Sequence, residues 1–381
     1  MKLFNRKRDV RSAAHDPAHE AEAYYTASQS QLIWRRFRKH KLAMGSAVVL
    51  IILYALAIFA PFFSPRDPHE RNLAYRSAPP QKIYFRDEDG FSLRPFVYPL
   101  KSRMDMATFS VVYEEDRTQK YPLYFFVRGY EYKLFGLFTT DIHLFGTGVD
   151  GVPVNLFGTD TLGRDLFART LYGARISLSI GFLGVAISMV LGILIGGLAG
   201  YLGGWVDEVI QRIIEMIKSI PHLPLWMALS AALPSTWTPV QIYVSIVVLL
   251  SLVSWTDLAR VVRGKFLALR NEDFVVAAEL AGRSRIEIIL IHMMPSFLSH
   301  IIASLTLSIP GMILGETSLS FLGLGLRSPT ISWGVLLERA QNVNTIAMEP
   351  WLMIPGIFVI ITVLAFNFLG DGLRDAADPY A

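Results

Sequence analysis

Acidic and basic residues gather in one short glycine-containing stretch that could do chemistry. The stretch contains Gly158, Thr159, Asp160, Gly163, Arg164 and Asp165. Two carboxyl groups at this spacing could act as a general acid and a general base, but turns and helix caps use Thr, Asp and Gly in the same pattern. We therefore expect a structural role, in which Gly158 permits a turn and Asp160 or Thr161 caps a helix. Arg164 and Asp165 would hold that helix against the preceding segment.

The rest of the sequence contains no recognisable motif for catalysis, metal binding or ATP binding. His222, His292 and His300 are scattered, without the paired spacing of metal ligands. The sequence has no cysteine, which removes thiolate metal sites and disulfides. It also lacks the Gly-x-x-x-x-Gly-Lys-Ser/Thr loop that cradles ATP phosphates. We expect no enzyme activity, and neither a cofactor nor a metal ion bound by this chain.

Composition indicates a polytopic membrane protein. Of the 381 residues, 52% are hydrophobic, and the mean hydropathy of +0.39 is too high for an ordinary soluble protein. The net charge is +4, and Lys and Arg gather beside apolar runs, as at cytoplasmic membrane boundaries. Membrane lipid is therefore an expected partner, whereas nothing in the charge calls for nucleic acid.

Apolar runs long enough to cross about 30 Å of hydrocarbon predict an all-α polytopic protein with six transmembrane helices. We expect a cytoplasmic tail at 1–41, a first helix at 42–63, an exported insert at 64–172, a transmembrane core at 173–371 with a cytoplasmic loop at 261–294, and a cytoplasmic tail at 372–381. Within the core, the expected crossings lie at 176–201, 205–233, 240–255, 296–319 and 351–369.

The insert is expected to be the one soluble subdomain. Residues 82–86 and 91–98 flank an Asp-Glu-Asp-Gly turn, and aromatic side chains alternate with others along 121–132. These patterns predict hairpin strands in an α/β or mainly β insert. Aromatic residues on such strands are typical of a small core, and a docking surface for another protein is the alternative.

Two features of the expected helices concern packing. Gly192, Gly196, Gly200 and Gly204 recur at every fourth residue, a spacing that lets helices approach closely in lipid; a substrate-lining role is the alternative. Glu316 falls inside the expected fifth crossing, where a charge facing lipid costs about 2.5–3.5 kcal/mol. It should turn inward, either for structural hydrogen bonding or as part of a solute pathway.

A polar helix-turn-helix separates the expected fourth and fifth crossings. Its residues of interest are Asp273, Phe274, Ala277, Ala278, Glu279, Ala281, Gly282, Arg283, Ser284 and Pro295. Asp273 is expected to cap a short helix that ends at Gly282 in a left-handed conformation. Ser284 and Glu287 have the spacing of a capping box for a second helix. Small alanines leave room for a partner, so we expect a surface offered to another protein; an ordinary amphipathic loop is the alternative.

This element resembles the EAA coupling loop of ABC-importer permeases. The resemblance rests on the spacing from Ala277 and Ala278 to Gly282 and then thirteen residues on to Pro295. The motif's leading Glu is Val276 here.

A second likeness is to the dipeptide/oligopeptide permease subfamily. The Gly-Thr-Asp-x-x-Gly-Arg-Asp run at 158–165 is similar to the segment that precedes the second membrane helix in that subfamily. Residues 333–334, 350–356 and 367–379 resemble it as well. The likeness covers 155–381, and the insert corresponds to a long-loop variant.

The resemblance implies the permease subunit of an ATP-driven ABC importer of the type I kind, forming half of a pathway for peptides or similar small solutes. Implied partners are a second homologous permease, two cytoplasmic ATPases that bind ATP and magnesium, and a periplasmic or lipid-anchored solute-binding protein. The 273–295 loop would couple to the ATPases. The implied location is the bacterial inner membrane, with both termini cytoplasmic. Metal chelates, opines and oligosaccharides are alternative solutes.

Two other classes are weighed against this one. An ion-coupled secondary transporter would need paired buried charges or matched broken helices in an inverted repeat, and Glu316 is the single candidate charge we identify for such a mechanism. A membrane-anchored receptor would bind its partner through residues 64–172 alone.

Overall fold

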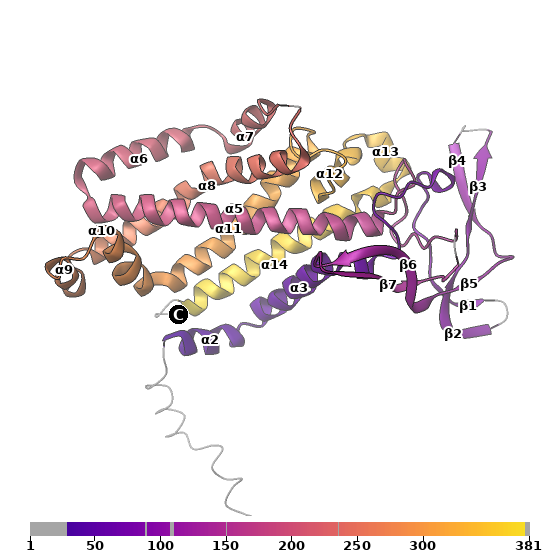
Figure 1. Cartoon of the computed structure of the whole chain (residues 1–381), viewed down its shortest axis with the longest axis horizontal. Coiled ribbons are helices and arrows are strands. Elements are labelled where there is room, and N and C mark those ends of the chain that lie inside the picture. Colours follow the sequence, from indigo (N-terminus) through magenta and orange to yellow (C-terminus); the bar gives the residue numbers. More distant parts are fainter. Residues whose placement is uncertain (1–28, 88–89, 107–109, 150, 235, 378–381) are drawn as a thin grey trace, which may run out of the picture.

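The computed structural model describes residues 29–87, 90–106, 110–149, 151–234 and 236–377. Most of the expected tail at 1–41, and the last four residues of the one at 372–381, lie outside the described residues. Helices run along the long axis of the molecule, and the strands gather at one end (Figure 1). The short helices α9 (Asp273–Leu280) and α10 (Arg285–Glu287) lie at the other end.

Five helical segments in the described part of the chain are long and apolar enough to cross a membrane. They contain α3 (Lys41–Ile58), α5 (Leu166–Leu202), α8 (Pro239–Leu269), α11 (Leu298–Phe321) and α14 (Ile354–Ala377). They correspond to the first, second, fourth, fifth and sixth expected crossings. α5 and α8 are longer than expected because polar residues such as Arg169 and Arg263 continue the helix beyond its apolar run.

The expected third crossing at 205–233 does not form one continuous helix. It divides into α6 (Gly204–Ser219) and α7 (His222–Ala231). Pro221 has no N–H to donate and disfavours a helical conformation at Ile220, whose φ and ψ are −95° and 128°. Neither piece reaches the length of a candidate span, since α6 has 16 residues and α7 has 10.

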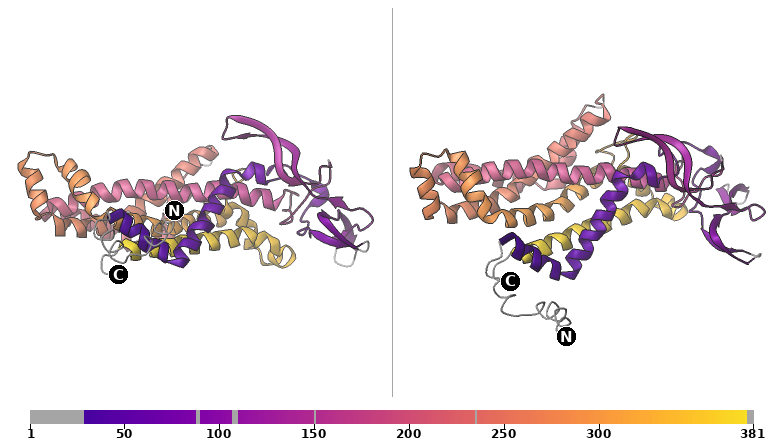
Figure 2. Two further views of the ribbon diagram at one scale, coloured as in Figure 1. Left: turned by 90° about the horizontal axis from the view of Figure 1, so that it is seen from below. Right: turned by 60° about the horizontal axis from the view of Figure 1, so that its bottom comes forward.

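Shorter elements complete the helical part. They are α2 (Gln29–Lys39), α4 (Ala60–Phe63), η1 (Leu73–Tyr75), η2 (Ile288–Met293), η3 (Met294–Phe297), α12 (Trp333–Leu337), η4 (Glu338–Gln341), α13 (Val343–Met348) and η5 (Pro350–Met353). α2 lies against α14 at the end opposite the strands (Figures 1 and 2).

Within the described residues, the strands form three small antiparallel sheets. β1 (Tyr84–Asp87), β2 (Gly90–Val97) and β5 (Tyr121–Pro122) make one, β3 (Leu100–Asp105) pairs with β4 (Ser110–Glu115), and β6 (Tyr124–Leu134) pairs with β7 (Phe138–Gly146). The expected strands are present, although 121–132 divides between β5 and β6. The expected aromatic core is only partial, because Phe96, Tyr98 and Tyr132 are buried whereas Phe91, Phe125 and Phe126 are exposed.

The small residues of α5 lie against α8. A side-chain carbon added at Gly196 would overlap the backbone of Ala259, and one at Gly200 would come within 2.6 Å of the Arg263 carbonyl oxygen. Gly192 faces Leu258 in the same way. This confirms that the four-residue glycine spacing serves close helix packing, except at Gly204, where an added carbon would meet nothing within 4 Å.

We predict that Gly196→Ala destabilises the chain by about 1–3 kcal/mol, because the new methyl group would force α5 and α8 apart. The matched control is Gly264→Ala on α8, where an added carbon has no neighbour within 4 Å. That variant should be neutral or more stable by up to about 1 kcal/mol, since alanine favours helices. Chemical unfolding in detergent micelles measures both, and equal losses in the two variants would contradict the prediction.

Candidate functional site

The turn at 158–165 is built against the segment that follows the first membrane helix. Gly158 has a φ of +74°, and a side-chain carbon there would come within 2.6 Å of the Ala78 carbonyl oxygen. The Thr159 N–H donates to that oxygen at 2.9 Å, while the Ala78 N–H donates to Thr159 Oγ1 at 2.9 Å. Gly158 thus permits the turn, as expected.

Asp160 closes this turn and caps no helix. Its Oδ1 accepts the N–H groups of Leu162 at 2.9 Å and Arg164 at 3.0 Å. Its Oδ2 accepts the Arg164 Nε–H at 2.7 Å and lies 3.6 Å from Nη1 of buried Arg169. Since two guanidinium groups surround its second oxygen, the geometry gives Asp160 a structural place and no evident acid–base one.

Asp165 is the residue that caps α5, and the expectation that Asp160 or Thr161 does so is wrong. The Asp165 Oδ2 accepts the Ala168 N–H at 2.8 Å. Its Oδ1 is buried with no hydrogen-bond partner among the described residues. Burial raises the pKa of this carboxyl to about 6, against the opposing effects of the Ala168 N–H and the Arg66 charge. Arg164 pairs with Asp160 and does not hold the helix directly.

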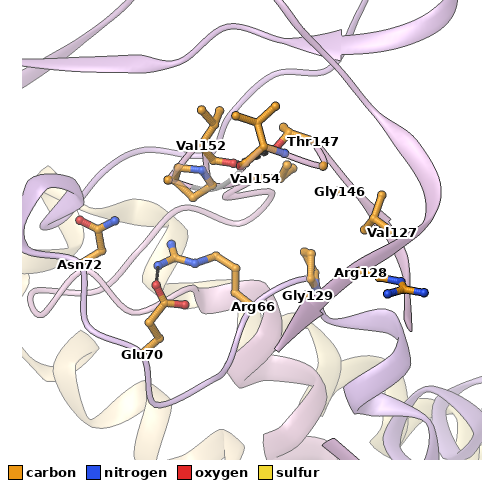
Figure 3. A pocket seen from close by; sticks show the side chains of 15 residues that line it. Arg66, Glu70, Asn72, Val127, Arg128, Gly129, Gly146, Thr147, Val152 and Val154 are labelled. Carbon is orange, nitrogen blue, oxygen red and sulfur yellow. Dashed lines mark hydrogen bonds and ion pairs between the residues drawn. The ribbon is translucent and has the colours of Figure 1, made fainter. Parts of the chain in front are cut away.

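A polar cavity of about 250 Å³ lies between the segment at 65–72, the β6–β7 hairpin and the loop at 147–154. Figure 3 shows Arg66 and Glu70 on its wall, joined by a 2.9 Å ion pair. Arg66 also donates to Asn155 Oδ1 at 3.2 Å. The buried guanidinium therefore ties the segment after α4 to the strand-side loop that precedes the 158–165 turn.

Glu316 lies fully buried where α5, α11 and α12 meet. Three serine hydroxyls donate to its carboxyl group: Ser332 at 2.7 Å, Ser320 at 2.8 Å and Ser177 at 3.3 Å. Ser177 in turn accepts the Trp333 N–H at 3.1 Å. The carboxyl group points inward and binds segments that are far apart in sequence.

At the opposite end, residues 273–295 form a compact turn between α8 and α11, which we call the elbow. Gly282 has a φ of +75°, and its N–H donates to the Glu279 carbonyl at 2.9 Å. Ser284 and Glu287 form the expected capping box. The Ser284 N–H donates to Glu287 Oε2 at 2.9 Å, and the Glu287 N–H donates to Ser284 Oγ at 3.3 Å. The cap of α9 differs from expectation, because Glu272 holds the cap position and Asp273 is the first helical residue.

The elbow presents one face to solvent and buries the other. Val275 and Ala278 are buried, so Ala278 is not available to a partner, contrary to expectation. The exposed residues of interest are Asp273, Phe274, Ala277, Glu279, Ala281, Gly282, Arg283, Ser284 and Pro295. Leu280 is 85% exposed although it is apolar.

Sequence reasoning missed residues in both the buried polar network and the elbow. Ser177 and Ser332 were not singled out, because a serine in a helix or loop carries no signal for a carboxylate partner 139 or 16 residues away. Arg66 was also missed, since nothing local marks it as buried. The exposure of Leu280 was also missed, because Phe274, Val275 and Val276 are apolar in the same helix and nothing local separates the exposed residues from the buried Val275.

Multiple apolar helices, with a solvent-facing elbow at one end and a buried polar network at the other, define a multi-pass membrane protein. Residues 192–380 match the family "Binding-protein-dependent transport system inner membrane component". Residues 28–80 match "N-terminal TM domain of oligopeptide transport permease C". The chain is similar to the dipeptide transport system permease protein DppC of Bacillus subtilis, at 32% identity over 92% of this chain and 86% of the relative.

Two further relatives agree. The glutathione transport system permease protein GsiD of Escherichia coli O6:K15:H31 is 32% identical over 100% of this chain and 99% of that protein. The oligopeptide transport system permease protein OppC of Salmonella typhimurium is 40% identical over 64% of this chain and 79% of its own length. The chain belongs to the family of binding-protein-dependent transport inner membrane components, and it is a permease component of an ABC importer.

We predict that Asp165 makes stability fall as pH rises from about 4 to about 6. Its pKa is about 6 in the folded state against an ordinary 3.8, so the folded chain binds the proton more tightly and loses stability as the proton leaves. Asp165→Asn keeps an acceptor for the Ala168 N–H and should remove this dependence, worth about 3 kcal/mol. Unfolding midpoints measured between pH 3 and 7 test it.

Asp116 supplies a control of opposite sign. Hydrogen bonds from Lys101 and Thr118 lower its pKa to about 2, so its contribution is present above about pH 4 and disappears as pH falls towards 2. Asp116→Asn should therefore leave the slope between pH 4 and 6 in place. If Asp165→Asn also left that slope in place, the assignment to Asp165 would be wrong.

Proposed function

We propose that this permease forms half of a translocation pathway for peptides or similar small solutes, and that the elbow receives the action of cytoplasmic ATPases. The relatives are named for dipeptide, oligopeptide and glutathione transport, and these names support the solute class. The exposed apolar surface of the elbow is the observation that carries the coupling role. Phe274 and Val276 are 43% and 42% exposed beside the more exposed Leu280. An apolar surface of this kind is better suited to contact with another protein than to contact with water.

The connections of the elbow favour transmission of movement. Only residues 270–272 separate α8 from α9, and the path from α10 through η2 and η3 to α11 is helical throughout. Val275 and Ala278 pack with Phe266 of α8 and Ile289 of η2 in one buried cluster. A push on α9 would therefore tilt α8 and α11 together and shift the pathway between inward and outward access, a two-state change biased by nucleotide.

The proposed topology follows from charge. Arg260, Arg263, Lys265 and Arg270 precede the elbow and favour the cytoplasm for that end, as do the basic residues 35–41 before α3. Both termini and the elbow would then be cytoplasmic, the strands at 64–172 exported, and the membrane the bacterial inner membrane. Six crossings of the type I arrangement would require the α6–α7 pair to serve as the third.

The partners follow from the same proposal. They are a second homologous permease, two cytoplasmic ATPases and a periplasmic or lipid-anchored solute-binding protein. ATP and magnesium would bind the ATPases, since the sequence of this chain has no phosphate-binding loop. We also infer that the 158–165 turn and Glu316 act structurally and do not line the pathway.

We predict that Gly282→Val abolishes both solute uptake and uptake-coupled ATP hydrolysis in the assembled transporter. A β-branched residue is strongly disfavoured at a φ of +75°, while an added carbon there meets nothing within 4 Å. The change should therefore deform the elbow without a packing clash. Uptake by proteoliposomes and ATPase rates measure the effect.

Gly264→Val is the matched control, because that position also has free space but a helical backbone. It should retain both activities. Assembly of each variant is checked by co-purification with the ATPases. Full activity of an assembled Gly282→Val transporter would refute the coupling role.

The energy source gives a separate prediction. Uptake into proteoliposomes should require ATP on the side of the elbow and should persist when the proton gradient is collapsed with an ionophore. Uptake that follows the gradient and ignores ATP would favour an ion-coupled secondary transporter. Competition by short peptides, compared with oligosaccharides and metal chelates, tests the solute class.

A further inference from the structure

The β6–β7 hairpin carries an unusually apolar tip. Residues 134–138, which we call the tip, include Phe135, Leu137 and Phe138, whose exposed fractions are 59%, 78% and 66%. Three large apolar side chains exposed within four residues are uncommon on a surface that meets only water. The pairing of β6 with β7 does not depend on these side chains, because backbone pairing joins the two strands from Tyr124 to Gly146.

The tip lies beside the end of the first membrane helix. The rings of Phe135 and Phe59 meet edge to face with centroids 5.6 Å apart, and Phe59 directly follows α3. α3 has 18 residues and is therefore about 27 Å long, close to the thickness of the hydrocarbon. Since α3 begins at Lys41, Phe59 and the tip lie near the opposite boundary of the bilayer. Figure 2 shows the hairpin reaching back from the strand end alongside the helices.

The position of the hairpin is fixed by contacts at its middle. His143 on β7 contacts the Pro61 carbonyl oxygen through Nδ1 at 2.8 Å and the Tyr130 carbonyl oxygen through Nε2 at 3.0 Å. The Tyr130 hydroxyl meets that of Tyr172 on α5 at 3.1 Å. These contacts attach the hairpin to both α4 and α5, so the position of the tip relative to the helices is fixed by polar groups that are buried or partly buried.

The chemistry around the tip matches that of a bilayer surface. The outward side chains of α3 continue the apolar surface, with Ile51 67% and Ile58 45% exposed. Charged residues lie on the strands that lead to the tip. Lys133, next to the tip, is exposed, and farther along the hairpin Arg128 lies 3.8 Å from Asp141. Segments that enter the headgroup region typically carry apolar residues at their tip and charged residues on the adjoining strands. Their long basic side chains reach back to water.

We propose that the tip inserts into the lipid leaflet opposite the Lys41 end of α3, so that the hairpin anchors the strand region to the bilayer. The inference goes beyond the transport role and requires only that α3 crosses the membrane. The occupant of this surface is lipid, because the apolar surface of the tip is continuous with that of α3. A companion protein covering the tip is the competing outcome.

The absence of cysteine from the sequence allows a direct test. Single-cysteine variants Leu137→Cys, Leu93→Cys and Ile51→Cys of the full chain, assembled with its companion subunits in lipid nanodiscs, are labelled with a nitroxide. Leu93 on β2 is 92% exposed and serves as the water control, and Ile51 serves as the lipid control. Collision of each label with oxygen and with a water-soluble nickel chelate is measured by electron paramagnetic resonance.

The label at Leu137 should behave like the one at Ile51, with access to oxygen and with nickel collisions about tenfold below those at Leu93, because a hydrated complex does not enter hydrocarbon. Nickel access equal to that at Leu93 would overturn the proposal. Protection from both reagents would overturn it as well, since it would mean that protein covers the tip. Each substitution replaces an exposed side chain, so all three variants should fold.

Discussion

Close contact between α5 and α8 is the constraint on which the other parts of the structure depend. In lipid, helices gain little from excluding water, so the distance of approach decides how much their contact contributes. Gly192, Gly196 and Gly200 bring the backbone of α5 against Leu258, Ala259 and Arg263. α5 has 37 residues and is about 55 Å long. One rigid helix therefore runs from the Asp165 cap, beside the strands, to the level of the elbow, and α8 leads directly into the elbow.

Some polar groups inside the molecule join segments that are distant in sequence. Arg66 with Asn155 joins the segment after α4 to the loop before α5, and Glu316 with its three serines joins α5, α11 and the loop before α12. An unpaired polar group in such surroundings is costly. The same groups that make these joints specific would therefore destabilise any arrangement in which one partner was missing.

Features governed by neighbouring residues could be predicted from the sequence, and those set by distant contacts could not. The left-handed Gly282 and the capping box of Ser284 and Glu287 depend on local backbone geometry, and both were expected. Asp165 caps α5 in place of the expected Asp160 or Thr161, because the Asp160 carboxylate pairs with Arg164 and Arg169. Residue spacing does not reveal these side-chain partners. Burial of Ala278 is set by packing against Phe266 and Ile289. The crossing expected at 205–233 gave no indication that Pro221 would separate α6 from α7 completely.

The serine cage around Glu316 restricts which parts of the permease are free to move independently. Its three hydroxyl groups come from α5, from α11 and from Ser332 at the start of α12. Withdrawing any one segment would strand a carboxyl group in an apolar interior. A change of access would thus move this corner as a single rigid block. The hinges would lie outside it, where movement does not uncover the Glu316 carboxyl group.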